Sequence, residues 1–305
     1  MSGADLDEGL HVAARILGEL ASRNEPLGAR TTYRSGGSAA LLVVVNDEDS
    51  LAVVSDAVRE SGVEVLVVGN GSNLLIAERG FSGVVVALGP AYDWIRVEDE
   101  TITAGGATAL PVLARRAATA ARPTLAWAVG IPGSVGGAVA MNAGGHGSDT
   151  ASALLECRVA DLVAGGIVTL RPDELEFSYR HSALRSTDVV VQATFAAPHG
   201  DAELAARSIE EIVRWRRLNQ PGGRNAGSVF QNPVGDSAGR IIDELGLKGF
   251  RIGGASISEK HANFIQLDVG ASSDDVAALI EAVIRIVEER AGVRLVPEVR
   301  RIGFD

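Results

Sequence analysis

Gly69-Asn70-Gly71-Ser72-Asn73-Leu74-Leu75 decides the fold, because this glycine-rich stretch directly follows an apolar, β-rich run at residues 63–68. Backbone N–H groups at glycine turns can converge on phosphate oxygens, since no Cβ keeps the ligand away. The dinucleotide-binding fingerprint needs a third glycine where Leu74 stands, and residues 72–82 are too few for its crossover helix. Asp93 lies about where a ribose-binding acid would fall, which alone is a weak signal. The stretch therefore indicates a phosphate-binding loop outside an ordinary nicotinamide Rossmann domain.

A second glycine-rich stretch reads Gly130-Ile131-Pro132-Gly133-Ser134-Val135-Gly136-Gly137-Ala138 and continues to Asn142-Ala143-Gly144-Gly145. Close packing of a helix or strand would explain one such stretch. Two in one domain, each with serine and asparagine side chains for hydrogen bonds, favour pyrophosphate binding. Residues 123–145 carry no charge, but Pro132 and six glycines would break an apolar helix. We therefore expect a ligand loop here rather than a membrane span.

Apolar periodicity on either side of these stretches predicts a mixture of helices and strands. We expect helices at residues 9–22, 47–61, 111–121 and 201–217, the last of these with an apolar stripe of Leu204, Ile209, Ile212 and Val213. We expect a final helix after a cap at Ser272 or Ser273, with Val276, Leu279, Ile280, Val283 and Val287 as its buried stripe. We expect strands at residues 39–45, 63–68, 83–88, 154–160, 167–170, 188–195 and 295–302, and a hairpin at 95–103. The run Asn219-Gln220-Pro221-Gly222-Gly223 has the composition of a domain boundary.

The composition is that of a globular protein with an acidic surface. With 46% hydrophobic and 22% charged residues among 305, the chain is neither disordered nor fibrous. The formal charge of −11 disfavours nucleic acid as a partner, because such a surface repels phosphate backbones. A small anionic ligand, held by a few arginines or by backbone N–H groups, is compatible with this charge.

Cysteine and histidine usage limits the kinds of site. Cys157 is the only cysteine, so neither an intramolecular disulfide nor a cysteine metal cluster can form, and its apolar neighbours predict a core position. The five histidines are scattered and none forms a metal-binding motif, so no metal site is expected. Residues 1–8 are acidic and lack an apolar signal core, so we expect a cytoplasmic protein without membrane insertion.

Seven motifs occur in the order found in UDP-N-acetylenolpyruvoylglucosamine reductases, so the chain resembles this family over nearly its whole length. Besides the two glycine-rich stretches they are Thr32-Tyr33-Arg34-Ser35-Gly36-Gly37, Tyr179-Arg180-His181-Ser182, Gly227-Ser228-Val229-Phe230, Ser258-Glu259-Lys260-His261-Ala262-Asn263-Phe264 and Pro297-Glu298-Val299. The resemblance implies an α+β protein whose FAD-binding fold is of the vanillyl-alcohol-oxidase type. It implies two FAD-binding subdomains, at residues 1–86 and at 87–218 with 293–305, and a smaller α+β substrate-binding domain at 219–292. The inserted tyrosine-bearing loop of longer family members is missing, so the chain resembles the shorter type.

The same resemblance implies site residues. Taken singly, Arg180, Ser228 and Glu298 have ordinary explanations as a surface cation, a turn serine and a solvated acid. Within the family pattern Arg180 stabilises an enolate, Ser228 donates a proton, and Glu298 hydrogen-bonds the enolate or supports the proton relay. The implied cofactor-binding residues are Arg34, Gly69, Asn70, Gly71, Ser72, Asn73, Leu74, Gly130, Ile131, Pro132, Gly133, Ser134, Gly136, Gly137, Ala138 and Asn142. The implied substrate-binding residues are Tyr179, Arg180, Asn225, Gln231, Lys260 and Asn263.

The activity that the resemblance implies is the NADPH-dependent reduction of UDP-N-acetylglucosamine enolpyruvate to UDP-N-acetylmuramate, a step of peptidoglycan precursor synthesis. FAD would be the bound cofactor, NADPH the co-substrate, and the UDP-sugar enolpyruvyl ether the partner of a monomeric protein. Two alternatives stay open: another FAD-dependent oxidoreductase of this fold acting on an alcohol or hydroxy acid, and a non-catalytic nucleotide-binding relative. Gln231, where many relatives have a lysine, and Leu267-Asp268 bear on how tightly the substrate binds.

Overall fold

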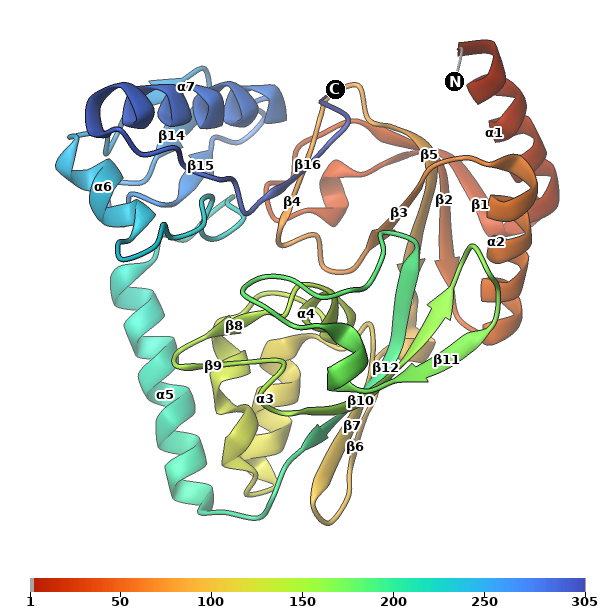
Figure 1. Cartoon of the computed structure of the whole chain (residues 1–305), viewed down its shortest axis with the longest axis horizontal. Coiled ribbons are helices and arrows are strands. Elements are labelled where there is room, and N and C mark those ends of the chain that lie inside the picture. The colour runs from red at the N-terminus through yellow and green to blue at the C-terminus, as the bar shows by residue number, and fades with distance from the viewer. Residues whose placement is uncertain (1–2, 305) are drawn as a thin grey trace. The chain divides into compact units, whose positions relative to one another are not determined.

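A computed structural model describes residues 3–304, and Figure 1 shows the course of the chain. The described residues form two compact units. The first comprises the residues up to Glu25, Ala39–Asn70 and Ser82–Trp215, and the second comprises Pro26–Ser38, Gly71–Phe81 and the residues from Arg216 onward. Each unit has apolar core clusters of its own.

A four-stranded sheet leads into the first glycine-rich stretch. Its strands, in the order β1-β2-β5-β3, are β1 (Ala21–Pro26), β2 (Ser38–Val45), β5 (Phe81–Leu88) and β3 (Val65–Val68). β3 and β5 run parallel, and the glycine-rich stretch begins directly after the last residue of β3. Helices α1 (Gly3–Leu17) and α2 (Glu48–Ser61) share a core with this sheet. Its fully buried members include Ala13, Val43, Val54, Ala57, Val84 and Val86.

Both ends of α2 are capped by residues at the ends of the predicted helix. A side-chain oxygen of Asp47 accepts a hydrogen bond of 2.7 Å from the Ser50 amide and so caps the helix. Gly62, with a φ of 65°, ends the helix in the left-handed conformation, and its amide donates to the Val58 carbonyl. The expected helix at residues 47–61 is confirmed.

A five-stranded antiparallel sheet carries most of the other elements of the first unit. In the order β11-β10-β12-β7-β6, its strands are β11 (Ile167–Leu170), β10 (Leu154–Asp161), β12 (Asp188–Ala196), β7 (Thr101–Gly105) and β6 (Ile95–Val97). Helix α3 (Leu110–Thr119), the 3-10 helix η4 (Pro123–Gly130) and helix α4 (Val135–Ala140) share one core with it. Cys157, on β10, is 1% exposed within this core, so its predicted core position is confirmed.

The first unit also contains short elements and most of one long helix. The short elements are η1 (Gly18–Leu20), η3 (Pro90–Tyr92), β8 (Gly144–Gly145), β9 (Ser148–Asp149) and η5 (Pro172–Leu175). Helix α5 (Ala202–Asn219) begins in this unit and confirms the predicted helix there. Only Ala205 of α5 is buried, so its expected apolar stripe is a weakly buried one.

The second unit is built around helix α7 (Ser273–Ala291) and a three-stranded antiparallel sheet, β13 (Arg251–Ile252), β14 (Ala255–Ile257) and β15 (Ile265–Leu267). Ser272 caps α7 through a hydrogen bond from the Asp274 amide, as one of the two expected caps. The fully buried stripe of α7 is the predicted one: Val276, Leu279, Ile280, Val283 and Val287. Helix α6 (Ala238–Glu244), η2 (Gly28–Arg30) and a parallel pair, β4 (Leu74–Ile76) with β16 (Arg300–Ile302), complete the unit.

Three local predictions are wrong. The expected strand at 295–302 is shorter, because only Arg300–Ile302 form β16. The expected helix at 9–22 ends at Leu17, because Gly18–Leu20 form a 3-10 turn and Ala21 starts β1, which leaves Leu20 40% exposed. Residues 123–145 are not one loop, since they contain η4 and α4; their small side chains allow helical turns to pack closely in the core. No helix among residues 3–304 is long and apolar enough to span a membrane.

Candidate active site

The two glycine-rich stretches meet in the first unit. A Cβ built on Gly69, the first residue after β3, would lie 2.4 Å from the Ser134 Oγ atom. No real Cβ comes that close, so a side chain at Gly69 would displace the Ser134 hydroxyl, which accepts from the Gly137 amide and caps α4. The structure thus brings together two stretches that are far apart in the sequence.

Main-chain hydrogen bonds hold the second stretch against residues 106–110. The Val135 amide donates to the Thr108 carbonyl (2.8 Å), and the Gly136 amide donates to the Gly106 carbonyl (2.9 Å). Ser134 caps α4, because its Oγ accepts a hydrogen bond from the Gly137 amide. Sequence reasoning missed Gly106, although the doublet Gly105-Gly106 at the end of a predicted strand was a usable signal. A Cβ on Gly106 would lie 2.0 Å from the Val190 carbonyl oxygen.

The other predicted cofactor residues of the first unit differ in exposure. Gly130 lies against the His146 ring, 2.7 Å from the position of an added Cβ, and that ring packs edge-on against Trp215. The exposed or partly exposed ones are Asn70, Ile131, Pro132, Gly133, Gly136 and Gly137. Ala138 and Asn142 are buried. Asn142 uses its carboxamide inside the protein, with Nδ2 donating to the Ser178 carbonyl at 3.0 Å.

Arg180 lies in a tight turn of the first unit. Ser178 and His181 exchange main-chain hydrogen bonds of 3.1 and 3.2 Å, and Arg180 has a φ of 55°. One terminal nitrogen of its guanidinium donates to the Gly144 carbonyl at 2.9 Å, and the guanidinium stacks over the Tyr179 ring at 5.1 Å from the ring centroid. Arg180 is half-buried, whereas Tyr179 is 57% exposed. The Gly144 carbonyl therefore tethers one side of the cation.

Ser228 and Glu298 are brought together in the second unit. The Glu298 amide donates to the Val229 carbonyl at 2.7 Å, and the Gln231 amide donates to the Val296 carbonyl at 2.9 Å. The Ser228 segment is thus paired with the segment that precedes β16. Both Ser228 and Glu298 are half-buried.

The end of the first glycine-rich stretch adjoins Glu298. Asn73 Nδ2 donates to the Glu298 carbonyl at 3.0 Å, and the Arg300 amide donates to the Asn73 carbonyl. Gly71 has a φ of 58°, and a Cβ on it would lie 1.9 Å from the Arg30 carbonyl oxygen. Ser72 is half-buried, and Leu74 is buried at the start of β4. In the second unit, therefore, predicted cofactor residues and a predicted catalytic residue are neighbours.

The predicted substrate residues of the second unit have clear local contacts. Asn263 is 4% exposed; its Oδ1 accepts from the Phe230 amide, and its Nδ2 donates to the Phe230 carbonyl. Asn225 accepts from the Gly227 amide and shapes the turn before Ser228. Lys260 donates to the Arg217 carbonyl near the end of α5. Gln231 is half-buried next to Phe230.

Arg34, predicted to bind the cofactor, is exposed in the second unit with a φ of 52°. Its amide donates to the Thr31 hydroxyl at 3.1 Å, so the turn that carries it is fixed. Next to it Tyr33 is fully buried, and burial raises the pKa of its hydroxyl far above the ordinary value.

The comparisons with known proteins agree over both units. Residues 218–302 match the family described as UDP-N-acetylenolpyruvoylglucosamine reductase, C-terminal domain, and residues 39–171 match the FAD binding domain family. The UDP-N-acetylenolpyruvoylglucosamine reductase of Heliobacterium modesticaldum is 47% identical over 284 residues, which cover 92% of this chain and 90% of the relative. This chain belongs to the UDP-N-acetylenolpyruvoylglucosamine reductase family. The Bacillus subtilis member is 38% identical over 92% of this chain and 93% of its own.

The solved structure of the family member from Thermus caldophilus agrees in fold. It superposes with a TM-score of 0.81 at 34% identity, over 92% of this chain and 98% of the other. The expected α+β fold with an FAD-binding fold of the vanillyl-alcohol-oxidase type is confirmed. FAD is accordingly the cofactor of this reductase family member.

The residues of the two glycine-rich stretches fit the diphosphate of FAD. Neither residues 69–75 nor residues 130–138 contain an acidic side chain, so nothing in them repels an anion. Glycine is required at Gly71, because an added Cβ would lie 1.9 Å from the Arg30 carbonyl oxygen, so the backbone there can approach a ligand closely. Main-chain N–H groups and small hydroxyls in these stretches suit diphosphate oxygens.

Proposed function

We propose that this chain is the FAD-dependent reductase that converts UDP-N-acetylglucosamine enolpyruvate to UDP-N-acetylmuramate with NADPH as the electron donor. One observation carries the residue roles: the Ser228 segment and Glu298 are paired by main-chain hydrogen bonds in a chain of this family. When bound and reduced, FAD supplies the hydride that the vinyl carbon of the substrate receives. The chain itself must stabilise negative charge and deliver a proton.

Arg180 is proposed to stabilise the charge that develops as an enolate on the carboxylate and its neighbouring carbon. A guanidinium stays protonated at any pH of interest, and its planar fork matches a carboxylate. Because its Gly144 tether fixes part of the guanidinium beforehand, less reorganisation is needed when charge develops. Tyr179, stacked beside it and exposed, is proposed to contact the substrate.

Ser228 is proposed to donate the proton to the carbanion-like carbon. A serine hydroxyl is a weak acid, but the intermediate is a strong base, so the transfer runs downhill. Asn225 and Asn263 support this role, because they fix the turn before Ser228 and the residue after Val229. Glu298, held by its main chain on both sides, is proposed to hydrogen-bond the enolate or to support the relay of the proton.

The remaining assignments are proposals on the same basis. Arg34, residues 69–74 and residues 130–138 are proposed to bind FAD, and Gln231 and Lys260 are proposed to bind substrate. The proposed domains are two FAD-binding subdomains, 1–86 and 87–218 with 293–305, and a substrate-binding domain at 219–292. The family match that begins at residue 218 supports the start of the substrate-binding domain at residue 219. We further propose a monomer that works in the cytoplasm.

The deciding experiment follows NADPH oxidation by the FAD-loaded protein with and without UDP-N-acetylglucosamine enolpyruvate. Oxidation that depends on this compound and yields UDP-N-acetylmuramate supports the proposal. Bound flavin without this dependence would contradict it and favour another oxidoreductase of the same fold. Rapid reoxidation of the flavin by oxygen with an alcohol as reductant would identify that alternative.

A further inference from the structure

The turn that carries Arg180 is strained and therefore needs anchors. A left-handed φ of 55° is unfavourable for a residue with a Cβ, and it persists only where neighbouring contacts over-determine it. The anchors of the turn consequently set the direction in which the Arg180 side chain points. They lie in the segment that ends α4 and follows it, residues 140–144.

Asn142 supplies the first anchor. Its Nδ2 donates to the Ser178 carbonyl at 3.0 Å and lies 3.4 Å from Asp149 Oδ2, while its Oδ1 accepts from the Ala151 amide at 3.0 Å. At 4% exposure, this carboxamide has its donors and its acceptor engaged inside the protein. Asn142 is thus placed to hold the turn rather than to contact the cofactor.

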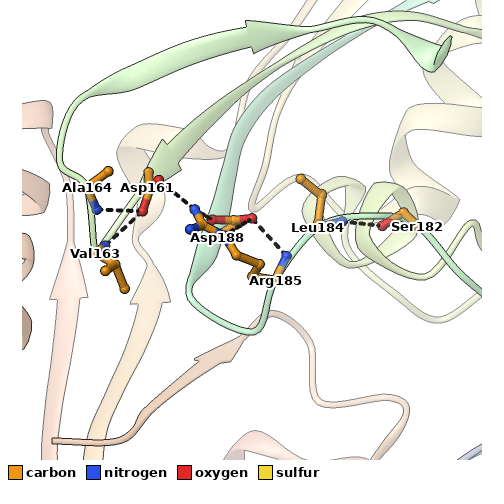
Figure 2. Close-up of polar contacts among 7 residues, drawn as sticks. All are labelled: Asp161, Val163, Ala164, Ser182, Leu184, Arg185 and Asp188. Carbon is orange, nitrogen blue, oxygen red and sulfur yellow. Dashed lines mark hydrogen bonds and ion pairs between the residues drawn. The ribbon is translucent and has the colours of Figure 1, made fainter. Parts of the chain in front are cut away.

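Ser182 supplies the second anchor, two residues after Arg180. It is 4% exposed, and its Oγ donates to the Ala140 carbonyl at 2.8 Å. The same Oγ accepts from the Leu184 amide at 3.4 Å, as Figure 2 shows. The Ser182 hydroxyl therefore ties the chain after Arg180 to the last residue of α4.

An ion-pair cluster fixes the far end of the segment that joins the Arg180 turn to β12 (Figure 2). Arg185 binds Asp188, at the start of β12, through its amide and its guanidinium, and it also contacts Asp161 at 2.5 Å. Asp161 in turn accepts from the Val163 and Ala164 amides. With its end fixed by Arg185, the stretch from 182 to 188 has little freedom to absorb a shift of the turn.

We propose that Asn142 and Ser182 are positioning residues that hold Arg180 in its productive orientation, Asn142 through the Ser178 carbonyl and Ser182 through the Ala140 carbonyl. This inference rests on the proposed function, because it takes Arg180 to be the residue that stabilises the enolate. Helix α4 ends at Ala140, which anchors Ser182, and begins after Ser134, which lies against Gly69. The same short helix therefore contacts both the first glycine-rich stretch and the segment that holds Arg180.

The test compares Ser182→Ala, Ser182→Thr and Asn142→Gly in the FAD-loaded protein. Glycine at 142 tolerates the local φ of 39°, so this variant removes the side chain without adding backbone strain. Flavin content and flavin reduction by NADPH are expected to match the wild type. The substrate-dependent step at saturating substrate is expected to slow by about tenfold or more in Ser182→Ala and Asn142→Gly, since a small misplacement has such an effect. Ser182→Thr, which keeps the hydroxyl, is expected to recover most of the rate.

Ser152→Ala is the matched control, because Ser152 is an exposed neighbour whose hydroxyl bonds Ser148 and Asp149 but not the turn. It is expected to behave like the wild type. In an Arg180→Ala background, Ser182→Ala is expected to add no further loss, since the group that it positions is gone. A full additional loss in that background would overturn the positioning role.

The outcomes separate the two proposals. If the wild type reduces the enolpyruvyl ether and both Ser182→Ala and Asn142→Gly do so at the wild-type rate, the positioning proposal alone is overturned. A wild-type protein that never reduces the enolpyruvyl ether would overturn the proposed function, and the role given to Arg180 would fall with it. Loss of flavin from Asn142→Gly, with the Ser182→Ala rate unchanged, would return Asn142 to the cofactor-contacting residues and reject its anchoring role.

Discussion

The main-chain amide of Glu298 donates a hydrogen bond of 2.7 Å to the carbonyl of Val229, the residue that follows Ser228. The Glu298 carbonyl in turn accepts from the Asn73 side chain. The two segments are therefore aligned by main-chain groups, which a side-chain substitution leaves in place. Changes at Ser228 or Glu298 should alter chemistry with little effect on the local backbone.

Ser228→Ala is expected to leave flavin reduction by NADPH near normal and to slow the substrate-dependent step by about a hundredfold or more, the usual contribution of a general acid. Stopped-flow absorbance of the flavin separates the two steps. Solvent deuterium should slow the wild-type step more than that of the variant. An unchanged substrate-dependent step would remove Ser228 from the reaction.

Arg180→Lys keeps the positive charge but loses the planar fork and the fixed bond to the Gly144 carbonyl. We expect the substrate-dependent step to slow by roughly tenfold or more, since a preorganised donor to a developing anion is lost. The measurement is kcat at saturating substrate, with flavin content as the control. Full activity in the lysine variant would show that a point charge is enough.

Gly69→Ala tests the contact between the two glycine-rich stretches. The added Cβ would lie 2.4 Å from Ser134 Oγ, so this hydroxyl must leave its cap on α4 and flavin affinity should fall by about tenfold. Gly222→Ala is the matched control, because nothing lies within 4 Å of a Cβ built there. Flavin titration of the apoprotein measures both. Equal affinities would show that the contact does not shape the cofactor site.

Periodicity and capping predicted most of the fold. The strand at 39–45, the helix at 47–61 and the stripe on α7 follow from local patterns that burial then reinforces. The helices inside residues 123–145 escaped prediction, because glycine and proline there signal a loop locally while the tertiary core stabilises helical turns. Tertiary contacts therefore determine the secondary structure of residues 123–145.

The sequence predicted the candidate site residues but not the residues that hold them in position. The motifs pointed to Arg180, but nothing in their spacing showed that Ser182 and Asn142 would form hydrogen bonds that hold the turn around it. Such partners depend on how a turn packs against a distant helix end. Gly106 was missed for the same reason, since its tight contact with Val190 is a tertiary one.

Cys157 should be inert in the folded protein. Burial in the core, with a smaller contribution from Glu156 and Glu174, raises the pKa of its thiol to about 12, so hardly any thiolate forms near neutral pH. A chromogenic disulfide reagent is expected to react with one thiol per chain in denaturant and very slowly without it. Rapid labelling of the folded protein would contradict the core position of β10.

Asp161→Asn tests the ion-pair cluster of Arg185, Asp188 and Asp161, which fixes the end of the segment that follows Arg180. Burial alone would raise the pKa of Asp161, but the Ala164 amide, the Arg185 guanidinium and the Val163 amide together lower it below its ordinary value of 3.8. A carboxylate with a depressed pKa stabilises the fold above that value, and the contribution is lost as the pH falls through the depressed pKa. We expect Asp161→Asn to lose about 1 kcal/mol of unfolding free energy at neutral pH. Urea unfolding at several pH values should show this difference shrink toward low pH, whereas Asp99→Asn, at an exposed hairpin position, should match the wild type throughout. A difference that stays constant down to the lowest pH would mean that the charge of Asp161 is not what stabilises the connection.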